Sequence, residues 1–555
     1  MERHSGPVEQ GCSQFPADAT IPLRIPVSVA REAIDAQRGN LCAETGPVRM
    51  PKPRPWTASR TAGYSFPEEA KRMPFPEAPA QSNGAACHRF SRPGRPRGKA
   101  SANRELRHSF TWRTLAAAGG MVSTLLLSVV VVRNLDPAEA ATFFAILAAL
   151  AFGPKIGCLG MGPNIIRLLP SEPDPLLRRQ LAGTHLRASL LLSAVSAPLI
   201  AFVGCNALIG HSDFLPVFVL ATVLIVIESL RLMLSDIFAA VGRVRASVAT
   251  MHYVRSMLVL PFVTLVLVVM GRSSLLWVVS VYLVVALVQF VFALVASRHH
   301  VAVFGGSFTW STMQQAIGQG AQLASLDLSE FLVMQGTIWL ATATLNPVAA
   351  TQYAAAVTLA MQVTVLESLA ALAASAPAAR LWAAGKKDQV VRMLSNASTL
   401  STVVVLVFVA LLAVFGPYAL ELAYGPGMRP AATMLLIIAI GGICQAFCKS
   451  SMIYLMVSGH LGAAARTATL VTVAAIGAAV AAVLLSGPFA LAVVTSVSVA
   501  ATSLFQWLTA RVILGRAPNA HFHVLRAARE LASDRDGEAS DADSGDGGAT
   551  SSRAA

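Results

Sequence analysis

Residues 129–150 read VVVVRNLDPAEAATFFAILAAL, and this stretch decides the fold. One apolar run ends in a short polar turn, and a second apolar run begins directly after it. The stretch therefore predicts two membrane-spanning helices joined by a short turn that contains Asp136 and Pro137. Their predicted extents, 112–132 and 139–162, are each long enough to cross about 30 Å of hydrocarbon.

The rest of the chain continues this pattern. Of its 555 residues, 55% are hydrophobic and only 13% are charged, and the mean hydropathy is +0.60. Soluble domains carry roughly 25% charged residues. We therefore predict an all-α polytopic membrane protein with about twelve transmembrane helices of about 20 residues or more. The predicted spans are 112–132, 139–162, 183–203, 215–240, 251–271, 275–297, 312–343, 348–377, 397–416, 430–457, 465–486 and 488–511.

The net charge of +14 follows the predicted topology and does not indicate nucleic-acid binding. Cytoplasmic loops are enriched in Lys and Arg, and here these residues occupy the N-terminal segment and alternate connections. Those connections carry Arg167, Arg178, Arg179, Arg187, Arg243, Arg245, Arg298, Arg380, Lys386, Lys387, Arg392 and Arg466. The other connections are nearly bare, with single exceptions at Arg133, Arg272 and Arg429. Both termini are therefore predicted to be cytoplasmic.

An internal repeat suggests that the spans form two halves. The turn NLDPAEAATFFAILAAL at 134–150 aligns, with one gap, with TLNPVAATQYAAAVTLA at 344–360. In both halves the next loop is basic, RLLPSEPDPLLRRQL at 167–181 and RLWAAGKKDQVVRML at 380–394. We predict parallel repeats about an axis along the membrane normal, a common plan among transporters.

The predicted domains follow from this repeat. We expect an N-lobe at 112–297 (helices 1–6), a cytoplasmic linker at 298–311 and a C-lobe at 312–512 (helices 7–12). The tail at 1–111 is rich in Pro and Arg, as in SRPGRPRGK, and the tail at 513–555 is acidic and rich in Ser and Gly. Both are expected to be disordered, and the basic cluster of the first suits anionic lipid headgroups.

Several stretches resemble the polysaccharide biosynthesis (O-antigen, Wzx-type) flippases of the multidrug, oligosaccharidyl-lipid and polysaccharide (MOP) exporter superfamily. They are VVVVRNLDPAEAATFF, IGCLGMGPNIIR, LSEFLVMQG, AATQYAAAVTL and LELAYGPGMRPAATMLLIIAIG. The resemblance covers about 112 to 512 and neither tail. The long N-terminal tail departs from the family, as does a second acid, Asp327, beside Glu330, which fits the family spacing better.

The resemblance implies two six-helix lobes around a central cavity that opens to each side in turn. It implies transport of a lipid-linked (undecaprenyl-diphosphate) oligosaccharide across the bacterial inner membrane, with membrane lipids and other polysaccharide-assembly membrane proteins as candidate partners. One alternative is a cation-coupled multidrug antiporter of the same superfamily. A less favoured one is an O-antigen polymerase or ligase, because the chain shows no catalytic constellation and no large external loop. No cofactor, metal site or disulfide framework is expected from the seven scattered cysteines.

Ionisable residues in hydrocarbon are costly and usually face a cavity or a partner. Lys155, Arg231, Arg255 and Lys449 are the candidate cations for a diphosphate. Arg231 lies three residues after Glu228, so the two could simply neutralise each other. Arg255 is predicted close to the cytoplasmic interface, where snorkelling is the favoured interpretation.

Three acids are candidates for coupling transport to an ion: Asp327, Glu330 and Glu367. Asp327 and Glu330 lie one turn apart on the same helix face, without Lys or Arg nearby on that helix. Two carboxylates this close in a low dielectric do not both ionise readily, so one could carry a proton or share a cation. The alternative is that both hydrogen-bond to glutamines of the cavity and only hold helices together. Tyr353 could line a sugar path or anchor the helix at the interface.

Overall fold

The computed structural model describes residues 99–271, 273–298, 300–301, 310–521 and 523–524. This part of the chain is helical and contains no strand. The N-terminal helices are α2 (Lys99–Asn134), α3 (Pro137–Cys158), α4 (Met161–Ser171), α5 (Pro175–Gly204), α6 (Phe214–Ala240), α7 (Val244–Ala249), α8 (His252–Thr264) and α9 (Leu275–Ser297). The C-terminal helices are α10 (Trp310–Met334), α11 (Gly336–Thr344), α12 (Pro347–Ala383), α13 (Lys387–Tyr424), α14 (Arg429–Cys448), α15 (Ser450–Val457) and α16 (Leu461–Leu514).

The helices confirm the predicted multi-pass membrane protein. Within the described residues, nine helical segments are long and apolar enough to cross a membrane. One of them, α16, comprises two predicted spans that meet at Gly487, where the backbone leaves the helical region (φ 77°, ψ −158°). The predicted spans 312–343 and 348–377 correspond to α10 with α11 and to α12, whose polar residues dilute their hydropathy. Every predicted span therefore corresponds to a helix.

Interruptions inside the spans were not predicted from hydropathy. The span predicted at 139–162 breaks after α3, where Leu159 (φ 39°) and Gly160 (φ 73°) adopt left-handed conformations before α4 begins. The seventh span breaks at Gln335, between α10 and α11. Such breaks leave backbone groups without helical partners, which is tolerated in a membrane only where protein or a water-filled cavity satisfies them.

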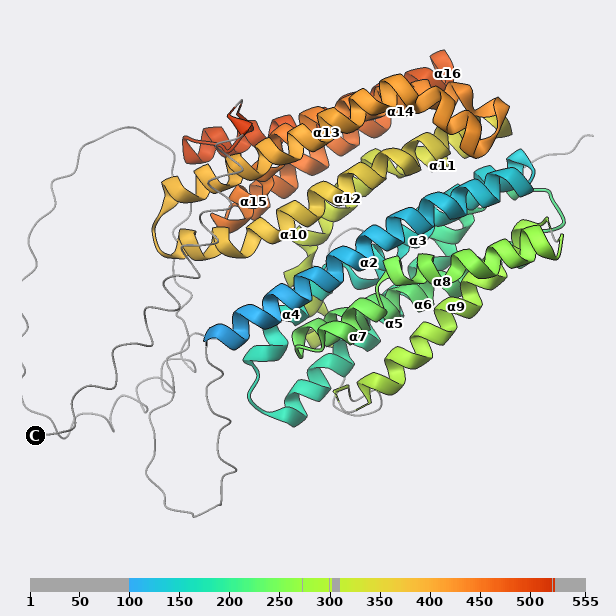
Figure 1. The fold of residues 1–555 in the computed structure, drawn as a ribbon. Helices are drawn as coiled ribbons and strands as arrows, with labels where there is room; N and C mark the ends of the chain where they lie inside the picture. The colour runs from blue at the N-terminus through green and yellow to red at the C-terminus, as the bar shows by residue number, and fades with distance from the viewer. Residues whose placement is uncertain (1–98, 272, 299, 302–309, 522, 525–555) are drawn as a thin grey trace, which may run out of the picture. The chain divides into compact units, whose positions relative to one another are not determined.

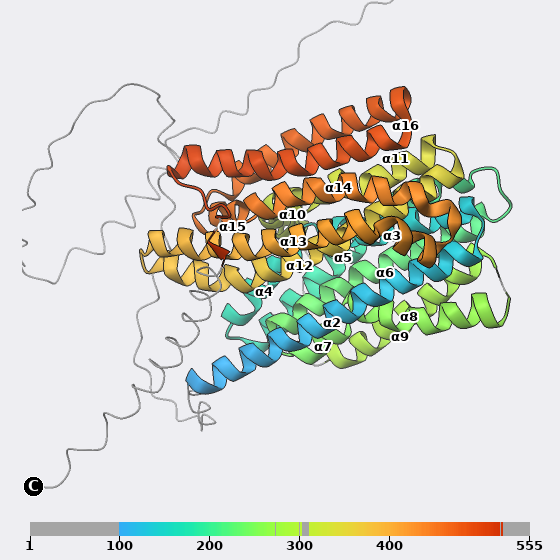
Figure 2. The same cartoon turned by 45° about the horizontal axis from the view of Figure 1, so that its top comes forward.

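The helices pack as two groups, which we call the N-lobe (α2–α9) and the C-lobe (α10–α16). In the N-lobe, α2 packs on α8, α3 on α5 and α6, and α6 on α9. In the C-lobe, α14 packs on α13 and α16, and α10 on α16. Figure 1 shows the blue-to-green helices together and the yellow-to-red helices together, and Figure 2 shows α16 as two arms side by side. Most of the predicted linker, 298–311, lies outside the described residues, and the domain limits stay predictions.

The two lobes begin their second helices in the same way, as the internal repeat predicted. Asp136 occupies the N-cap position of α3 with φ −64° and ψ 152°, and Asn346 that of α12 with φ −64° and ψ 154°, each followed by proline. Only the Asn346 side chain also accepts a hydrogen bond from the helix, from Ala349 N. We call the end of the helices that carries these two turns the turn end. The opposite end carries the connections from α4 to α5 and from α12 to α13. The helix ends beside these connections hold Arg178, Arg179, Arg380 and Lys387, and we call this end the basic end.

The hydrophobic core joins the lobes near the turn end. Ala354, Ala355 and Ala356 of α12 are fully buried in the same cluster as Phe143 and Phe144 of α3. Small residues let α12 approach α3 closely, which favours helix packing in a membrane.

The tails predicted at 1–111 and 513–555 lie mostly outside the described residues. Their described parts are attached to the lobes. The first helix, α2, already begins at Lys99. After α16 ends, the Pro518 carbonyl accepts a hydrogen bond from Ser451 Oγ at 3.0 Å, and His521 Nε2 lies 2.8 Å from Asn396 Oδ1. The chain therefore stays packed on the C-lobe to His521, while the limit of the C-terminal tail stays a prediction.

Candidate functional site

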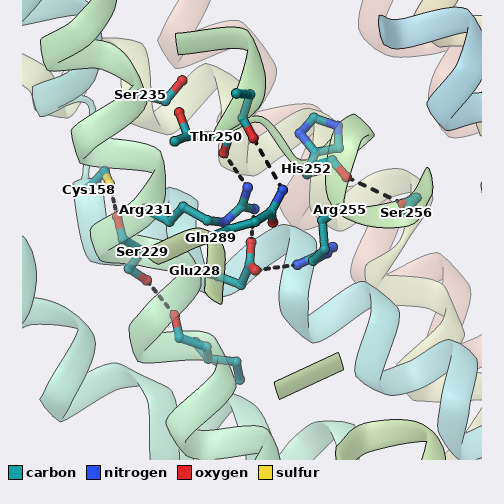
Figure 3. A network of polar contacts seen from close by, with 12 residues as sticks. Cys158, Glu228, Ser229, Arg231, Ser235, Thr250, His252, Arg255, Ser256 and Gln289 are labelled. Carbon is teal, nitrogen blue, oxygen red and sulfur yellow. Dashed lines mark hydrogen bonds and ion pairs between the residues drawn. The ribbon is translucent and has the colours of Figure 1, made fainter. Parts of the chain in front are cut away.

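A buried ion cluster lies inside the N-lobe, at Glu228 and Arg231 of α6 and Arg255 of α8 (Figure 3). Glu228 accepts a hydrogen bond from Arg231, and Arg255 Nη1 lies 2.7 Å from Glu228 Oε1. Relative exposure is 2% for Glu228 and Arg231 and 6% for Arg255. Glu228 and Arg231 are thus paired, which is the arrangement in which the two charges neutralise each other. The snorkelling expected for Arg255 is wrong, because its guanidinium reaches Glu228 on the neighbouring helix.

Arg231 of this cluster and two neighbouring side chains bind the backbone at the break between α7 and α8. Arg231 donates to the carbonyl of Thr250, and Gln289 Nε2 of α9 donates to the carbonyl of Ala249 at 3.2 Å. Ser235 Oγ of α6 donates to the carbonyl of Ser247 at 3.0 Å. The last carbonyls of a helix have no partner within the helix, so these side chains satisfy the end of α7. The cluster therefore has an architectural role as well as a charge.

A second ion pair lies inside the C-lobe, between Glu330 of α10 and Lys449, which follows α14. Gln445 Nε2 also donates to Glu330 Oε1, at 3.3 Å. The Glu330 side chain remains 43% exposed and the Lys449 side chain 16% exposed. The pair borders a cavity of about 30 Å³, enough for a water molecule. Its other polar lining comes from Thr502, Ser503 and Gln506 of α16.

The sequence could not pair Lys449 with Glu330, because they are far apart in the chain. Asp327, the other acid of α10, is exposed and lies outside this pair. It interacts electrostatically with Lys155 of α3, whose side chain is half-buried, and also with Glu330 and Lys449. The side chain of Glu367, in α12, lies outside the described residues, so its coupling role stays a prediction.

Lys155 and Asp327 belong to a seam where α3 runs against α10 and α11. Trp339 Nε1 of α11 donates to the Ala145 carbonyl of α3 at 2.9 Å. Phe152 of α3 stacks on Phe331 of α10 with ring centroids 4.6 Å apart. Trp339 contacts both rings, at 5.3 Å and 5.6 Å.

The seam ends, toward the basic end, in a contact between glycine backbones. A Cβ atom placed on Gly320 of α10 would lie 2.6 Å from the Gly160 carbonyl carbon and 2.6 Å from the Leu159 oxygen. The α3 side of the contact is the left-handed turn that ends this helix. Sequence reasoning missed the seam, because only the fold brings these segments together.

At the turn end, side-chain hydrogen bonds also join the lobes. Arg133 Nε, at the end of α2, donates to the Ala423 carbonyl at 2.6 Å, and Ser128 Oγ lies 2.7 Å from Tyr424 Oη. Thr351 Oγ1 of α12 donates to the Pro137 carbonyl at 2.7 Å. Arg133 thereby satisfies the last turn of α13.

Tyr353 neither lines a path nor anchors at an interface in this structure. Its side chain is fully buried, and its hydroxyl lies 2.7 Å from Thr495 Oγ1 of α16. A Tyr in a membrane span can be retained for such packing, which its position beside a predicted turn did not indicate.

Among the described residues, no group of three or more His, Cys, Asp or Glu could hold a metal ion. The cysteines of this part of the chain, Cys158, Cys205, Cys444 and Cys448, are free. The ionisable groups that the seam and the C-lobe cavity present are therefore the chemistry the site offers: one lysine, one exposed carboxylate and one ion pair.

Comparison with known proteins supports the fold. No protein-family model matches the chain, and no curated protein matches it. An inward-facing multidrug resistance MATE family transporter of the MOP superfamily matches with a TM-score of 0.57 at 16% identity, over 73% of this chain and 98% of that one. The lipid II flippase MurJ, in an inward closed conformation, matches with a TM-score of 0.58 at 12% identity, over 72% and 87%.

An outward-facing MATE family transporter of the MOP superfamily matches less well, with a TM-score of 0.51 at 15% identity, over 73% of this chain and 95% of that one. At these identities the likeness concerns the fold. The chain therefore has the fold of MOP-superfamily transporters and flippases.

Proposed function

We propose that the chain is a flippase that moves a lipid-linked oligosaccharide, carried on an undecaprenyl-type diphosphate, across the bacterial inner membrane. Surface polysaccharide biosynthesis is the process that this transport would serve. The fold suits this role, since proteins of the same fold include a lipid flippase. The sequence resemblance to polysaccharide flippases supports the same cargo class.

The charge of the N-lobe carries this proposal. Two guanidinium groups, Arg231 and Arg255, share one carboxylate, Glu228, so their cluster retains a positive charge in the N-lobe interior. Lys155 adds a second positive charge at the seam. The electric field of fixed charges is strong where water is scarce. The N-lobe face of the pathway should therefore attract a diphosphate and repel a cationic drug.

Lys155 is the cation that we assign to the cargo. Arg231 and Arg255 are almost fully buried and engaged inside the N-lobe, and Lys449 is paired with Glu330. While the lobes are closed along the seam, Asp327 balances the charge of Lys155. Opening of the seam separates the two, and the lysine then binds a phosphate oxygen of the headgroup.

Asp327 is the acid that we assign to coupling. It is exposed, whereas Glu330 is held by Lys449 and Gln445. When Lys155 binds cargo, Asp327 loses one of the two lysine charges that act on it, the other being Lys449, and can accept a proton or a cation. The family spacing favours Glu330 for this role, and the geometry favours Asp327.

The test is translocation of a fluorescent polyprenyl-diphosphate oligosaccharide in proteoliposomes. We expect Lys155→Met to slow translocation about tenfold or more, since a hydrogen bond to a charged group contributes about 1.5–3 kcal/mol. Lys386→Met removes an exposed lysine at the basic end and should leave the rate unchanged. Equal rates in parent and Lys155→Met vesicles would remove Lys155 from the binding site.

The same vesicles separate the alternatives. Gradient-driven efflux of a cationic dye, with no movement of the lipid-linked glycan, would establish a multidrug antiporter. Lengthening of the glycan would establish a polymerase. In cells, a flippase predicts that deletion abolishes a surface polysaccharide and leaves its lipid-linked repeat unit on the cytoplasmic face.

A further inference from the structure

The two ends of the lobe interface are built differently. At the turn end, alanines of α12 pack into a common core with α3, and side chains such as Arg133 and Thr351 donate across the interface. At the basic end, α10 meets the α3–α4 break through glycine backbone. Separation at the turn end exposes the common apolar core and leaves hydrogen-bond donors without partners. Separation at the basic end exposes the two glycines and Ile317 of α10, which packs on the N-lobe cluster around Met161 and Ile165.

The seam between these ends is antiparallel. Ala145 meets Trp339, Phe152 meets Phe331, and Gly160 meets Gly320, so residue numbers rise along α3 while they fall along α11 and α10. A seam of this kind can part progressively from one end. Lys155 and Asp327 lie between the aromatic rings and the glycines, so they are the first charges freed when the basic end parts.

We propose that the contact between Gly160 and Gly320 is the gate of the pathway at the basic end, and that glycine is required at both positions to close it. A Cβ on Gly160 would lie 2.1 Å from the Gly320 oxygen. Real Cβ atoms essentially never lie closer than 3.0 Å to another heavy atom of this kind. Both obstructing groups are backbone, so no side chain can turn aside. Any side chain at Gly320 therefore holds the basic end open.

This proposal rests on the alternating access of the proposed function and not on the cargo. It is tested with Gly320→Ala, because Gly320 is helical and alanine there carries no backbone strain. The matched control is Gly318→Ala, on the same helix, where a Cβ would meet nothing within 4 Å. Alanine favours a helix over glycine, so helix propensity changes equally in both variants.

The readout needs no substrate. Spin labels are attached at Gln180→Cys of α5 and Gln389→Cys of α13, both exposed at the basic end, after replacement of the native cysteines. Their distance is measured in the full chain in nanodiscs. We expect Gly320→Ala to shift the distribution to longer distances and Gly318→Ala to match the parent. Identical distributions in all three would overturn the gate.

Gly160→Ala provides a second variant, with Gly242→Ala as its control. Gly242 has nearly the same φ (74° against 73°), but a Cβ there meets nothing within 4 Å. Both substitutions therefore put alanine at a positive φ of nearly the same value, and they differ in the contact that the Cβ would make. A shift with Gly160→Ala alone supports the gate, and equal shifts in both variants would attribute the effect to backbone strain.

A tether tests the gate without a glycine substitution, should the alanine variants not fold. A short bifunctional reagent joins the cysteines at 180 and 389 in the otherwise parental chain. Transport that stops on tethering and returns on cleavage of the reagent supports the gate. Transport that continues unchanged under the tether shows that the basic end does not open.

Discussion

Glu228 is the residue on which the N-lobe cluster depends most. It is the partner of both Arg231 and Arg255, and all three are buried. Glu228→Gln leaves two buried guanidinium groups without their counter-charge, and loss of one member of a buried pair costs about 3–5 kcal/mol. We expect a large drop in thermal stability in detergent, measured by size-exclusion recovery after heating.

The control for this prediction is Glu421→Gln. Glu421 lies 3.9 Å from Arg429, and the side chains are 40% and 65% exposed. Exposed pairs contribute about 0–1 kcal/mol, so recovery should hardly change. If Glu228→Gln melts like Glu421→Gln, the cluster does not hold the N-lobe together.

Variants of Glu330 and Lys449 distinguish a structural role of Glu330 from a role in ion coupling. Glu330→Gln removes the carboxylate that pairs with the more buried ammonium, at a cost of about 1–3 kcal/mol, and Glu330→Gln with Lys449→Met removes both charges. We therefore expect the double variant to melt closer to the parent than the single one does.

Transport by the double variant gives the second readout. Recovered stability with recovered, gradient-dependent transport indicates that Glu330 only holds Lys449. Recovered stability without gradient dependence indicates that Glu330 takes part in coupling, which would contradict the assignment of Asp327.

For single residues, the sequence predicted ion-pair partners on the same helix and missed those on different helices. Glu228 and Arg231 are three residues apart, and helical periodicity brings them together. Arg255 and Lys449 find their acids on neighbouring helices, through packing that no local pattern encodes. The nominated residues other than Glu367 therefore fall into the N-lobe cluster, the C-lobe pair and the seam, and their functional roles stay predictions.

Among the elements, α16 depends on Gly487. Its conformation (φ 77°, ψ −158°) is one that glycine alone adopts readily, and a Cβ there would meet nothing within 4 Å. Gly487→Ala should therefore cost about 1–3 kcal/mol through backbone strain alone. Thermal stability in detergent measures this cost.

Gly477→Ala is the matched substitution within the first arm of α16. Its Cβ also meets nothing within 4 Å, but its backbone is helical, so alanine should stabilise the arm by up to about 1 kcal/mol. Opposite signs for the two substitutions confirm the turn, and equal effects would show that α16 is not bent at 487.

The spans were predictable because hydrocarbon imposes length and apolarity on each of them. The break after α7 was not, because it depends on which side chains of other helices satisfy the freed carbonyls. Gln289 and Arg231 do so at the end of α7, from two other helices. A hydropathy profile averages over a window of residues and therefore does not show a break at a single position.

For the whole molecule, orientation in the membrane is the first prediction to check. Cys205, the native cysteine near the connection from α5 to α6, is fully buried and would not report accessibility. Ser212→Cys in that connection and Lys386→Cys at the basic end are both exposed. An impermeant thiol reagent should label Ser212→Cys in intact cells and Lys386→Cys only after permeabilisation. The opposite pattern would invert the topology inferred from Arg and Lys.

The two-lobe plan could be predicted from the repeat, since Asp136 and Asn346 each precede a proline that starts a helix. The way in which the lobes meet could not. Glycines at 160 and 320 resemble many others in the sequence, and only the fold brings their backbones into contact.

The seam also supplies the protein with a fluorescent reporter of its own. The indole of Trp339 is packed on Phe152 and Phe331, and its N–H is bonded to the Ala145 carbonyl. An indole emits at longer wavelength once water surrounds it, so parting of the seam as far as Trp339 would redden its emission. Trp339→Phe would keep an aromatic ring in place and identify that signal among the seven tryptophans. The transport cycle could thus be followed by light, without any attached label.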